Sequence, residues 1–264
     1  MEKIFIMIKG LFQPKNNNMK PNLRNAIILC FIFISSYSVI AQTNPYLHIA
    51  NIPLPDGYAR ENVDTNSFTA WLRNLALKKS KTVYLYNGLP KRNQSAQFAV
   101  IDISVGKKDL QQCADAVMRL RAEYLYSKKR FTEISFSDNN HHDYRLNGLT
   151  DRKHFDRYLD NVFAKCGTAS LEKQLKSINE IDSIEPGDVL IQGGAPGHAM
   201  IIVDVAINKS GKRIFLLAQS YMPAQDVHIV VNPSNKSLSP WFELNDNSIY
   251  TPEWIFQKGH FKRW

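Results

Sequence analysis

The sequence predicts an α+β fold in which helices come first and an antiparallel sheet follows. The longest helical pattern, residues 107–130, is rich in Ala, Leu, Arg and Glu and contains no Gly or Pro. Apolar, β-branched runs at 188–192, 198–206 and 213–221 follow it, divided by segments that contain Gly. Residues 42–264 contain no linker rich in Gly, Ser or Pro, so we expect a single domain there.

The other elements follow from the same patterns. Residues 66–79 predict a helix capped by Asn66 or Ser67. Residues 150–167 predict a helix opened by Thr150, residues 170–178 predict a shorter helix, and a polar loop is expected between 135 and 148. The remaining strand patterns lie at 82–87, 97–105 and 226–231.

Residues 1–41 have the pattern of a secretory signal peptide. A basic leader begins at Met19, residues 26–34 form an apolar block, and Val39–Ala41 resemble a cleavage site; the stretch before Met19 reads as an upstream extension. The apolar block is shorter than the roughly 20 residues of a membrane span. We therefore expect a periplasmic or secreted protein with no stable membrane span after the signal is removed.

The charge of the chain excludes some partners. The formal net charge is +9, but residues 1–41 carry five basic side chains and one acidic one, which leaves +5 for residues 42–264. No basic helix with interleaved aromatic residues is present, so nucleic-acid binding is not expected. No His and Cys spacing of the zinc type occurs, so we expect neither a metal nor a cofactor.

Two cysteines, Cys113 and Cys166, remain after the leader. Cys113 lies on the apolar stripe of its helix, near the N-terminus if the helix starts at Lys108 or Asp109. The positive end of the helix dipole lowers the pKa of a thiol in that position, whereas Cys166 lies at the opposite end of its helix. Two structural alternatives stand beside a nucleophile: a packed core cysteine and a Cys113–Cys166 disulfide.

A single histidine opens the longest apolar strand pattern. The turn that follows centres between Lys209 and Ser210, so a regular hairpin places His198 opposite Tyr221. Gln219 is then the diagonal neighbour of His198 on the same face, within reach of its side chain. This register predicts a His198–Gln219 pair.

Residues 186–222, PGDVLIQGGAPGHAMIIVDVAINKSGKRIFLLAQSYM, resemble the core of papain-like amidases of the NlpC/P60 and CHAP kind. In those families a Gly-Asp pair opens one strand, as Gly187–Asp188 does here. A histidine opens the next strand, in the position of His198, and a polar residue lies near the end of the third, in the position of Gln219. The resemblance implies a papain-like NlpC/P60-type fold, with N-terminal helices packed on a C-terminal antiparallel sheet.

The segment QQCADAV is similar to the nucleophile segment of these families, which opens a helix. The resemblance implies that Cys113 is the nucleophile, that His198 is the general base and that Gln219 orients it. The backbone N–H of Cys113 would then contribute to the oxyanion hole. Gln112 and Arg121 are the candidates for binding substrate. Arg121 lies on the same face as Cys113, where it either clamps a substrate carboxylate or only snorkels or pairs with a carboxylate of the protein.

The resemblance, together with export, implies an exported cysteine amidase that acts on a peptide amide in cell-wall peptidoglycan; lipid esters or other acyl groups are the variant substrates. The chain departs from the pattern in three ways. Cys113 and His198 are 85 residues apart, which requires a helical insertion at about 130–180, the Asp-Cys-Ser-Gly signature is absent, and Gln219 carries no charge. The missing signature and the neutral Gln219 favour the alternative, a catalytically inactive papain-like scaffold that binds wall fragments or a protein partner.

A second resemblance covers nearly all of residues 42–264. The segments LQQCADAVMRLRAEYLY, PGHAMIIVDV and LLAQSYMPAQD resemble the secreted bacterial family called domain of unknown function 4846. This resemblance supports the domain boundaries and implies no activity.

Several other polar residues have two interpretations. Asp226 or His228 takes the place of Gln219 if the hairpin register differs. The run His141–Asp143 is a solvated loop or overhangs a cleft. The C-terminal tryptophans either pack in the core or line a groove for sugars; they are Trp241, Trp254 and Trp264.

Overall fold

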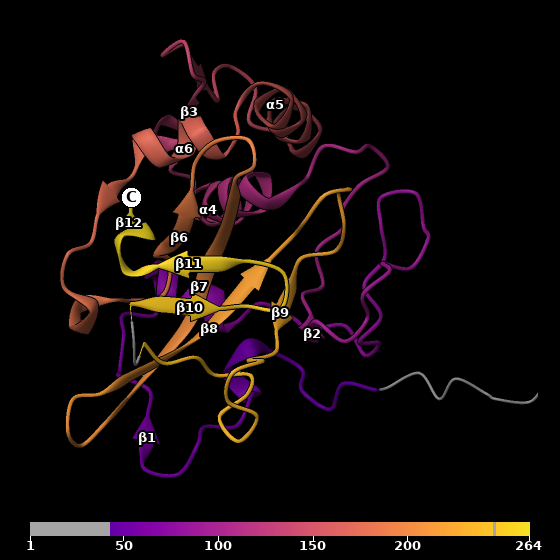
Figure 1. Cartoon of the computed structure of the whole chain (residues 1–264). Helices are drawn as coiled ribbons and strands as arrows, with labels where there is room; N and C mark the ends of the chain where they lie inside the picture. The colour runs from indigo at the N-terminus through magenta and orange to yellow at the C-terminus, as the bar shows by residue number, and fades with distance from the viewer. Residues whose placement is uncertain (1–42, 245–246) are drawn as a thin grey trace, which may run out of the picture. The chain divides into compact units, whose positions relative to one another are not determined.

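An antiparallel sheet organises the part of the chain that the structure describes. The computed structural model describes residues 43–244 and 247–264, so the predicted signal peptide lies outside the described residues. Residues 41–264 form one compact unit. The order in the main sheet is β2–β9–β8–β7–β6–β12–β5, with β1 paired to β7 (Figure 1). Its strands are β1 (Tyr58–Ala59), β2 (Gln97–Val100), β5 (Lys176–Ser177), β6 (Val189–Gln192), β7 (His198–Asn208), β8 (Arg213–Gln219), β9 (His228–Val230) and β12 (Phe261–Arg263).

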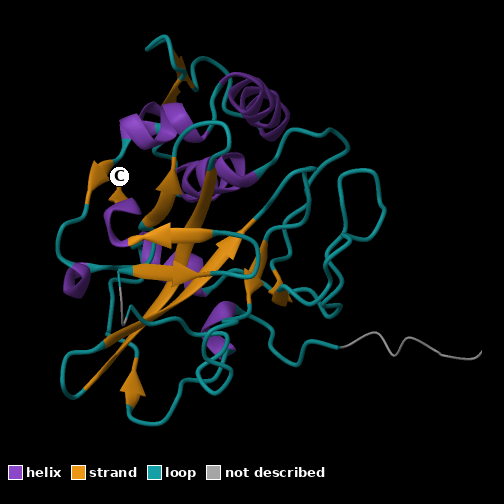
Figure 2. Ribbon diagram, in the orientation of Figure 1, coloured by secondary structure: helices purple, strands orange, loops and turns teal. Residues whose placement is uncertain are grey.

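Within the described residues, two short hairpins and four α-helices accompany the main sheet (Figure 2). The hairpins pair β3 (Ser135–Ser137) with β4 (Asp143–Arg145), and β10 (Ser248–Tyr250) with β11 (Ile255–Gln257). The helices are α3 (Phe68–Arg73), α4 (Cys113–Ser127), α5 (Arg152–Lys165) and α6 (Thr168–Gln174). Single 3₁₀ turns occur at Ile49–Asn51, Phe131–Glu133, Ile181–Ser183 and Lys258–His260. The α+β class is confirmed, whereas a papain-like fold stays a prediction.

Helices α4 and α5 begin later than the sequence patterns indicate, whereas α3 begins directly after its predicted cap Ser67 and α6 begins two residues early, at Thr168. Helices α3 and α6 also end before their predicted limits of 79 and 178, at Arg73 and Gln174. The longest one starts at Cys113 itself, because the carboxylate of Asp115 accepts the backbone N–H of Gln112 at 2.9 Å and closes the first turn there. The residues before it form a loop that includes Gly106, whose φ of +81° suits glycine. Helix α5 is capped by Asp151, which accepts the His154 N–H at 3.0 Å, and not by Thr150 as predicted.

Two segments differ from the predicted secondary structure. Residues 82–87 form isolated bridges rather than a strand, because Leu85 bonds back to Leu89 across a turn. The expected loop at 135–148 contains the β3–β4 hairpin, since Asp138 accepts two backbone N–H groups at the turn between the strands. Ser67 is confirmed as a cap, because its Oγ accepts the Ala70 N–H at 3.1 Å.

The central strand β7 separates two hydrophobic cores. Ala199 and Ile201 point into the larger core, which they share with α4, α5 and α6, while Met200 and Ile202 point into a smaller one. The β10–β11 hairpin contributes Ile249 and Phe256 to that smaller core. Figure 1 accordingly shows β10 and β11 in front of β7 and β8, with α4 behind them. Helix α4 and the hairpin therefore cover opposite faces of the sheet.

The register of β7 and β8 depends on a bulge. Near the turn, Ile207 pairs with Arg213, which is one residue out of the predicted register. A bulge between Ile202 and Asp204 then shifts the pairing, so that Ile201 pairs with Ala218 as predicted. The predicted register is thus correct at the His198 end because the turn and the bulge displace the strand in opposite directions.

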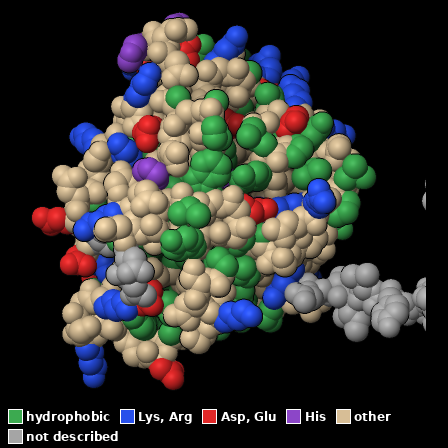
Figure 3. All heavy atoms as spheres, in the orientation of Figure 1, with side chains coloured by type: hydrophobic (Ala, Val, Ile, Leu, Met, Phe, Trp, Pro, Cys, Tyr) green, Lys and Arg blue, Asp and Glu red, His purple; other side chains and the backbone are tan. Residues whose placement is uncertain are grey.

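Charge and hydrophobic surface are mixed on the face seen in Figure 3. Hydrophobic side chains are spread over its middle, and Lys and Arg side chains lie mainly toward its edge. Among the described residues, no helix is both long and apolar enough to cross a membrane.

Candidate active site

A chain of buried hydrogen bonds starts at His198, the first residue of β7. Its Nε2 lies 2.8 Å from Oε1 of Gln219, near the end of the neighbouring strand β8. The amide Nε2 of Gln219 donates to Glu253 Oε2 at 2.7 Å, from the loop between β10 and β11. His198 and Gln219 are each 1% exposed. The structure therefore places the predicted pair in contact and adds a carboxylate behind it.

This arrangement fixes the tautomer of the imidazole. An amide nitrogen donates and an amide oxygen accepts, and a carboxylate only accepts. Glu253 therefore requires the Gln219 side chain to point its NH₂ toward the carboxylate and its Oε1 toward His198. Because Oε1 only accepts, His198 must carry its proton on Nε2, and its Nδ1 keeps a lone pair. A neutral Gln219 is thus oriented as firmly as a charged residue would be.

Lys91 and His228 close the network on its far side. Lys91 Nζ donates to Glu253 Oε2 at 2.7 Å and lies 3.3 Å from His228 Nε2. His228 Nδ1 lies 2.8 Å from the Asp226 carbonyl oxygen and therefore donates to it, which leaves Nε2 of His228 as an acceptor. Burial lowers the pKa of Lys91, and burial, with Lys91 beside it, lowers the pKa of His228 to about 3.

Aromatic rings enclose the imidazole of His198. The ring centroids of Tyr221 and Trp254 lie 4.8 and 5.4 Å from it, and that of Phe256 lies 5.9 Å away. Burial lowers the pKa of His198 to about 4, although the hydrogen bond to Gln219 works in the opposite direction. The imidazole is consequently a neutral base at neutral pH.

Cys113 reaches the same end of β7 from the opposite face of the sheet. The Ile202 N–H bonds to Asp188 on the β6 side, so by alternation the Ala199 N–H points toward β8. Strand β8 ends at Gln219, so the Ala199 N–H lies beyond the hydrogen bonds that join β7 and β8. This N–H instead donates to the sulfur of Cys113, which favours the thiolate form. The thiol therefore lies where the two strands part, next to the backbone that follows His198.

Burial raises the pKa of Cys113. The backbone N–H groups of Ala199 and Ala114 act in the opposite direction but do not outweigh it. The carboxyl of Asp115, two residues along, is itself buried, and burial raises its pKa well above the usual range. The helix start thus does not produce the lowered thiol pKa that the sequence analysis expected. Within the described residues, no hydrogen bond joins the thiol to the imidazole. Because the pKa of Cys113 is raised and that of His198 is lowered, both groups are neutral at rest.

The domain of unknown function (4846) family model matches residues 49–147 and 137–263. The chain belongs to this family. The match covers both Cys113 and the whole buried network. In the same comparisons, no curated protein and no solved structure matches the chain.

In this member of the 4846 family, the two predicted substrate-binding residues lie apart. Gln112 immediately precedes Cys113 and caps α4, and its side-chain amide donates to Asp109 at 3.2 Å. Arg121 lies two helical turns, about 12 Å, from Cys113 along the helix. Its guanidinium stacks on rings of Phe68 and Trp264, 5.3 and 5.6 Å from their centroids. Gln112 is thus beside the thiol, whereas Arg121 packs in an aromatic cluster, and substrate binding by either stays a prediction.

The other candidates occupy structural positions in this family member. Asp226 pairs with Lys78 at 2.8 Å and does not contact His198. The His141–Asp143 run forms the exposed β3–β4 turn. Cys113 and Cys166 are both free in the structure, and burial raises the pKa of Cys166 to about 12. No group of three or more potential metal ligands occurs among the described residues.

The sequence analysis did not identify Lys91 or Glu253 as members of the site. They are 162 residues apart in the chain, and neither belongs to a periodic pattern or a motif. Only the β10–β11 hairpin, which folds across the sheet, brings Glu253 to Gln219. Trp254, beside it, packs on the His198 ring, so this tryptophan belongs to the site.

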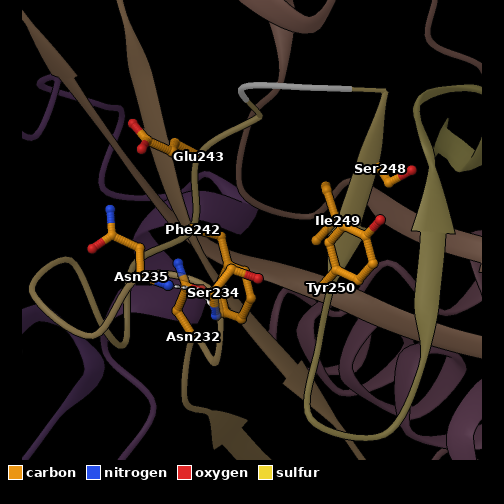
Figure 4. A pocket seen from close by; sticks show the side chains of 8 residues that line it. All are labelled: Asn232, Ser234, Asn235, Phe242, Glu243, Ser248, Ile249 and Tyr250. Atoms are coloured by element: carbon orange, nitrogen blue, oxygen red, sulfur yellow. Dashed lines mark hydrogen bonds between the residues drawn. The ribbon is translucent and has the colours of Figure 1, made fainter.

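A hollow of about 260 Å³ also lies near this hairpin (Figure 4). Asn232 and Phe242 line one side of it, and Ile249 and Tyr250 of β10 line the other. The Asn232 side chain donates to the Trp241 carbonyl and accepts the N–H groups of two neighbouring residues, so it stabilises the local turn. We therefore interpret this hollow as structural.

Proposed function

We propose that this protein is an exported cysteine amidase that cleaves peptide amides, with the peptides of cell-wall peptidoglycan as its substrate. One observation carries the proposal: Gln219, locked by Glu253, holds His198 with a bare Nδ1 at the strand end where the thiol of Cys113 lies. Nucleophilic catalysis by cysteine uses a base with a fixed tautomer and a thiol at a helix start, and these two groups lie at the same end of β7.

In the proposed reaction His198 Nδ1 takes the proton of Cys113 as the sulfur bonds to the amide carbon. The carbonyl π electrons move to oxygen, and the backbone N–H of Cys113 stabilises that oxyanion. Collapse of the intermediate breaks the C–N bond, and His198 returns the proton to the departing amine. Water then hydrolyses the thioester. Because thiol and imidazole start neutral, the proton must move during attack, which requires a closer or better aligned approach of the two side chains.

The test uses residues 42–264 and purified peptidoglycan. Newly released amino groups are measured for the parent, for Cys113→Ala and for the matched control Cys166→Ala, the other buried free thiol. We expect Cys113→Ala to abolish release and Cys166→Ala to preserve it. Release by Cys113→Ala at the parental rate would show that the thiol is not the nucleophile.

The raised pKa of Cys113 favours a second candidate function, that of an inactive scaffold which binds wall fragments or a protein partner. The two are separated by alkylation with iodoacetamide between pH 5 and 9, followed by peptide mapping. An active site predicts that Cys113 reacts in the folded protein and that His198→Gln slows the reaction. A thiol that reacts only after unfolding supports the scaffold.

A further inference from the structure

A second cleft, of about 360 Å³, flanks the start of α4. The loop at 104–111 forms one wall, and α4 and α5 form the other. Leu110, Leu159 and Phe163 provide apolar lining, while Gln111 and Arg119 provide polar groups. The cleft thus combines an apolar surface with a few converging polar side chains, as small-molecule sites do.

Gln111 has an unused donor in this cleft. Its residue is 1% exposed, and its side-chain oxygen accepts a hydrogen bond from Arg119. That bond turns the amide so that its NH₂ group faces the other way, and the NH₂ nitrogen has no hydrogen-bond partner among the described residues. A buried donor without a partner costs about 1–3 kcal/mol, so such a group marks a place where an acceptor is missing.

Arg119 adds a second donor of the same kind. Its Nη1 donates to the Ser104 carbonyl at 2.6 Å and to Gln111, which holds the guanidinium against the loop. Its Nε makes no hydrogen bond within the described part of the chain and lies 3.4 Å from Glu123. The Arg119 guanidinium, which is ion-paired with Glu123, therefore lies next to the unused amide donor of Gln111.

The remaining charges leave the cleft positive. Its two acidic side chains are already paired, Asp160 with Lys108 and Asp156 with Arg152, both at 2.7 Å. Lys107 also lines the cleft and has no ion-pair partner among residues 43–244 and 247–264. An anion entering the cleft would therefore meet the positive charge of Lys107 and the unused NH₂ group of Gln111, whereas a cation would meet carboxylates that are already neutralised.

We propose that this cleft binds the free carboxylate of a small peptide or N-acylated amino acid. The carboxylate would accept from the NH₂ of Gln111 and from Arg119, and the apolar side chain of the ligand would rest on Leu159 and Phe163. Gln111 lies two residues before Cys113, and its carbonyl accepts the Ser220 hydroxyl at 2.9 Å, which fixes the cleft relative to the strand end at Gln219. The proposal does not require Cys113 to be a nucleophile.

Binding is tested with two probes that differ only in charge, N-acetylalanine and N-acetylalaninamide. Each is titrated into ¹⁵N-labelled residues 42–264, and the side-chain NH₂ resonances of Gln111 are followed. We expect N-acetylalanine to shift them saturably and the amide to have no such effect. Because only binding is measured, the result is independent of any hydrolytic activity.

Three variants locate the site. Gln111→Glu keeps the shape and the acceptor for Arg119 but removes the NH₂ group and adds a negative charge, so carboxylate binding should be lost, as backbone resonances of the loop would show. Lys107→Gln, on the surface, should weaken binding about two- to fivefold without affecting the fold. Arg145→Gln, in the exposed β4, is the matched control and should bind like the parent.

Two outcomes would overturn the proposal. Equal shifts with the acid and the amide would mean that the cleft does not recognise a carboxylate. The absence of saturable shifts with either probe would mean that the unused Gln111 donor binds water only. Neither outcome would affect the proposed role of Cys113, which the release of amino groups tests separately.

Discussion

His198 Nε2 lies 2.8 Å from Gln219 Oε1, and the orientation of that amide is decided by Glu253 on its other side. The consequence is a base whose free nitrogen is fixed by a residue from a different part of the chain. Several measurements can test how this network behaves.

The tautomer of His198 is the first prediction. Long-range ¹H–¹⁵N spectra at neutral pH should show Nε2 protonated and Nδ1 bare in the parent. Gln219→Leu removes the acceptor and should yield a mixture of both tautomers. His154, on the exposed side of α5, provides the internal control. A parent protein with the proton on Nδ1 would contradict the deduction from Glu253.

The second prediction concerns the ion pair that supports the site. Lys91→Met leaves the largely buried Glu253 without its cation and should lower the free energy of unfolding by about 3 kcal/mol. Adding Glu253→Gln to Lys91→Met should recover much of that loss, because no buried charge then remains. Urea unfolding of both single variants and the double variant measures the coupling. Additive losses would show that the two side chains do not stabilise each other.

The stability of the protein should fall in acid. Burial lowers the pKa of His198 to about 4 and that of His228 to about 3, from an ordinary value of 6.5. Below pH 6.5 these two histidines therefore bind protons in the unfolded chain but stay neutral in the folded protein. The free energy of unfolding should drop from pH 6.5 toward pH 4 by up to about 1.4 kcal/mol per pH unit for each histidine.

His228→Gln isolates one of these two contributions. Its unfolding free energy should decline less steeply than that of the parent over the same pH interval, while His154→Gln serves as the matched control. Identical slopes for His228→Gln and the parent would mean that the buried imidazole is protonated in the folded state, contrary to its lowered pKa.

The last prediction concerns the bulge in β7. Asp204 is fully buried there and pairs with Arg60 at 2.6 Å and Arg73 at 2.7 Å. Asp204→Asn removes the charge that both guanidinium groups share and should cost roughly 3–5 kcal/mol. Asp143→Asn breaks an exposed pair with Arg145 and should cost less than about 1 kcal/mol. Thermal unfolding of both variants gives the comparison; similar losses would mean that Asp204 does not hold the bulge.

Much of the site could be predicted from local sequence patterns. Alternation along the strands placed His198 and Gln219 on one face, and the two residues are in contact. The bulge at Ile202–Asp204 could not be predicted from local sequence, because Asp204 there pairs with Arg60 and Arg73, which come from distant segments of the chain. The predicted β7–β8 register is therefore correct at His198 only because the one-residue error at the turn and the bulge that was not predicted offset each other.

The pKa of Cys113 likewise depends on tertiary packing as well as on the position of the residue in the sequence. Sequence position placed the thiol at a helix start, where the dipole favours a thiolate. In the folded protein the thiol form is favoured instead, because burial by β7 and its neighbours raises the thiol pKa more than the backbone N–H groups lower it. Burial is a property of the packed chain and cannot be summed from one helix.

The sequence by itself determined the α+β class and the main strands and helices, since these depend on periodicity within short segments, and it placed His198 and Gln219 at the same end of adjacent strands. Only the tertiary structure decided that Glu253 and Lys91 orient this pair, that Cys113 approaches from the opposite face, and that Gln111 keeps an unused donor in a cleft. Those relationships join residues far apart in the chain, and they arise only when the hairpin, sheet and helix exclude water together.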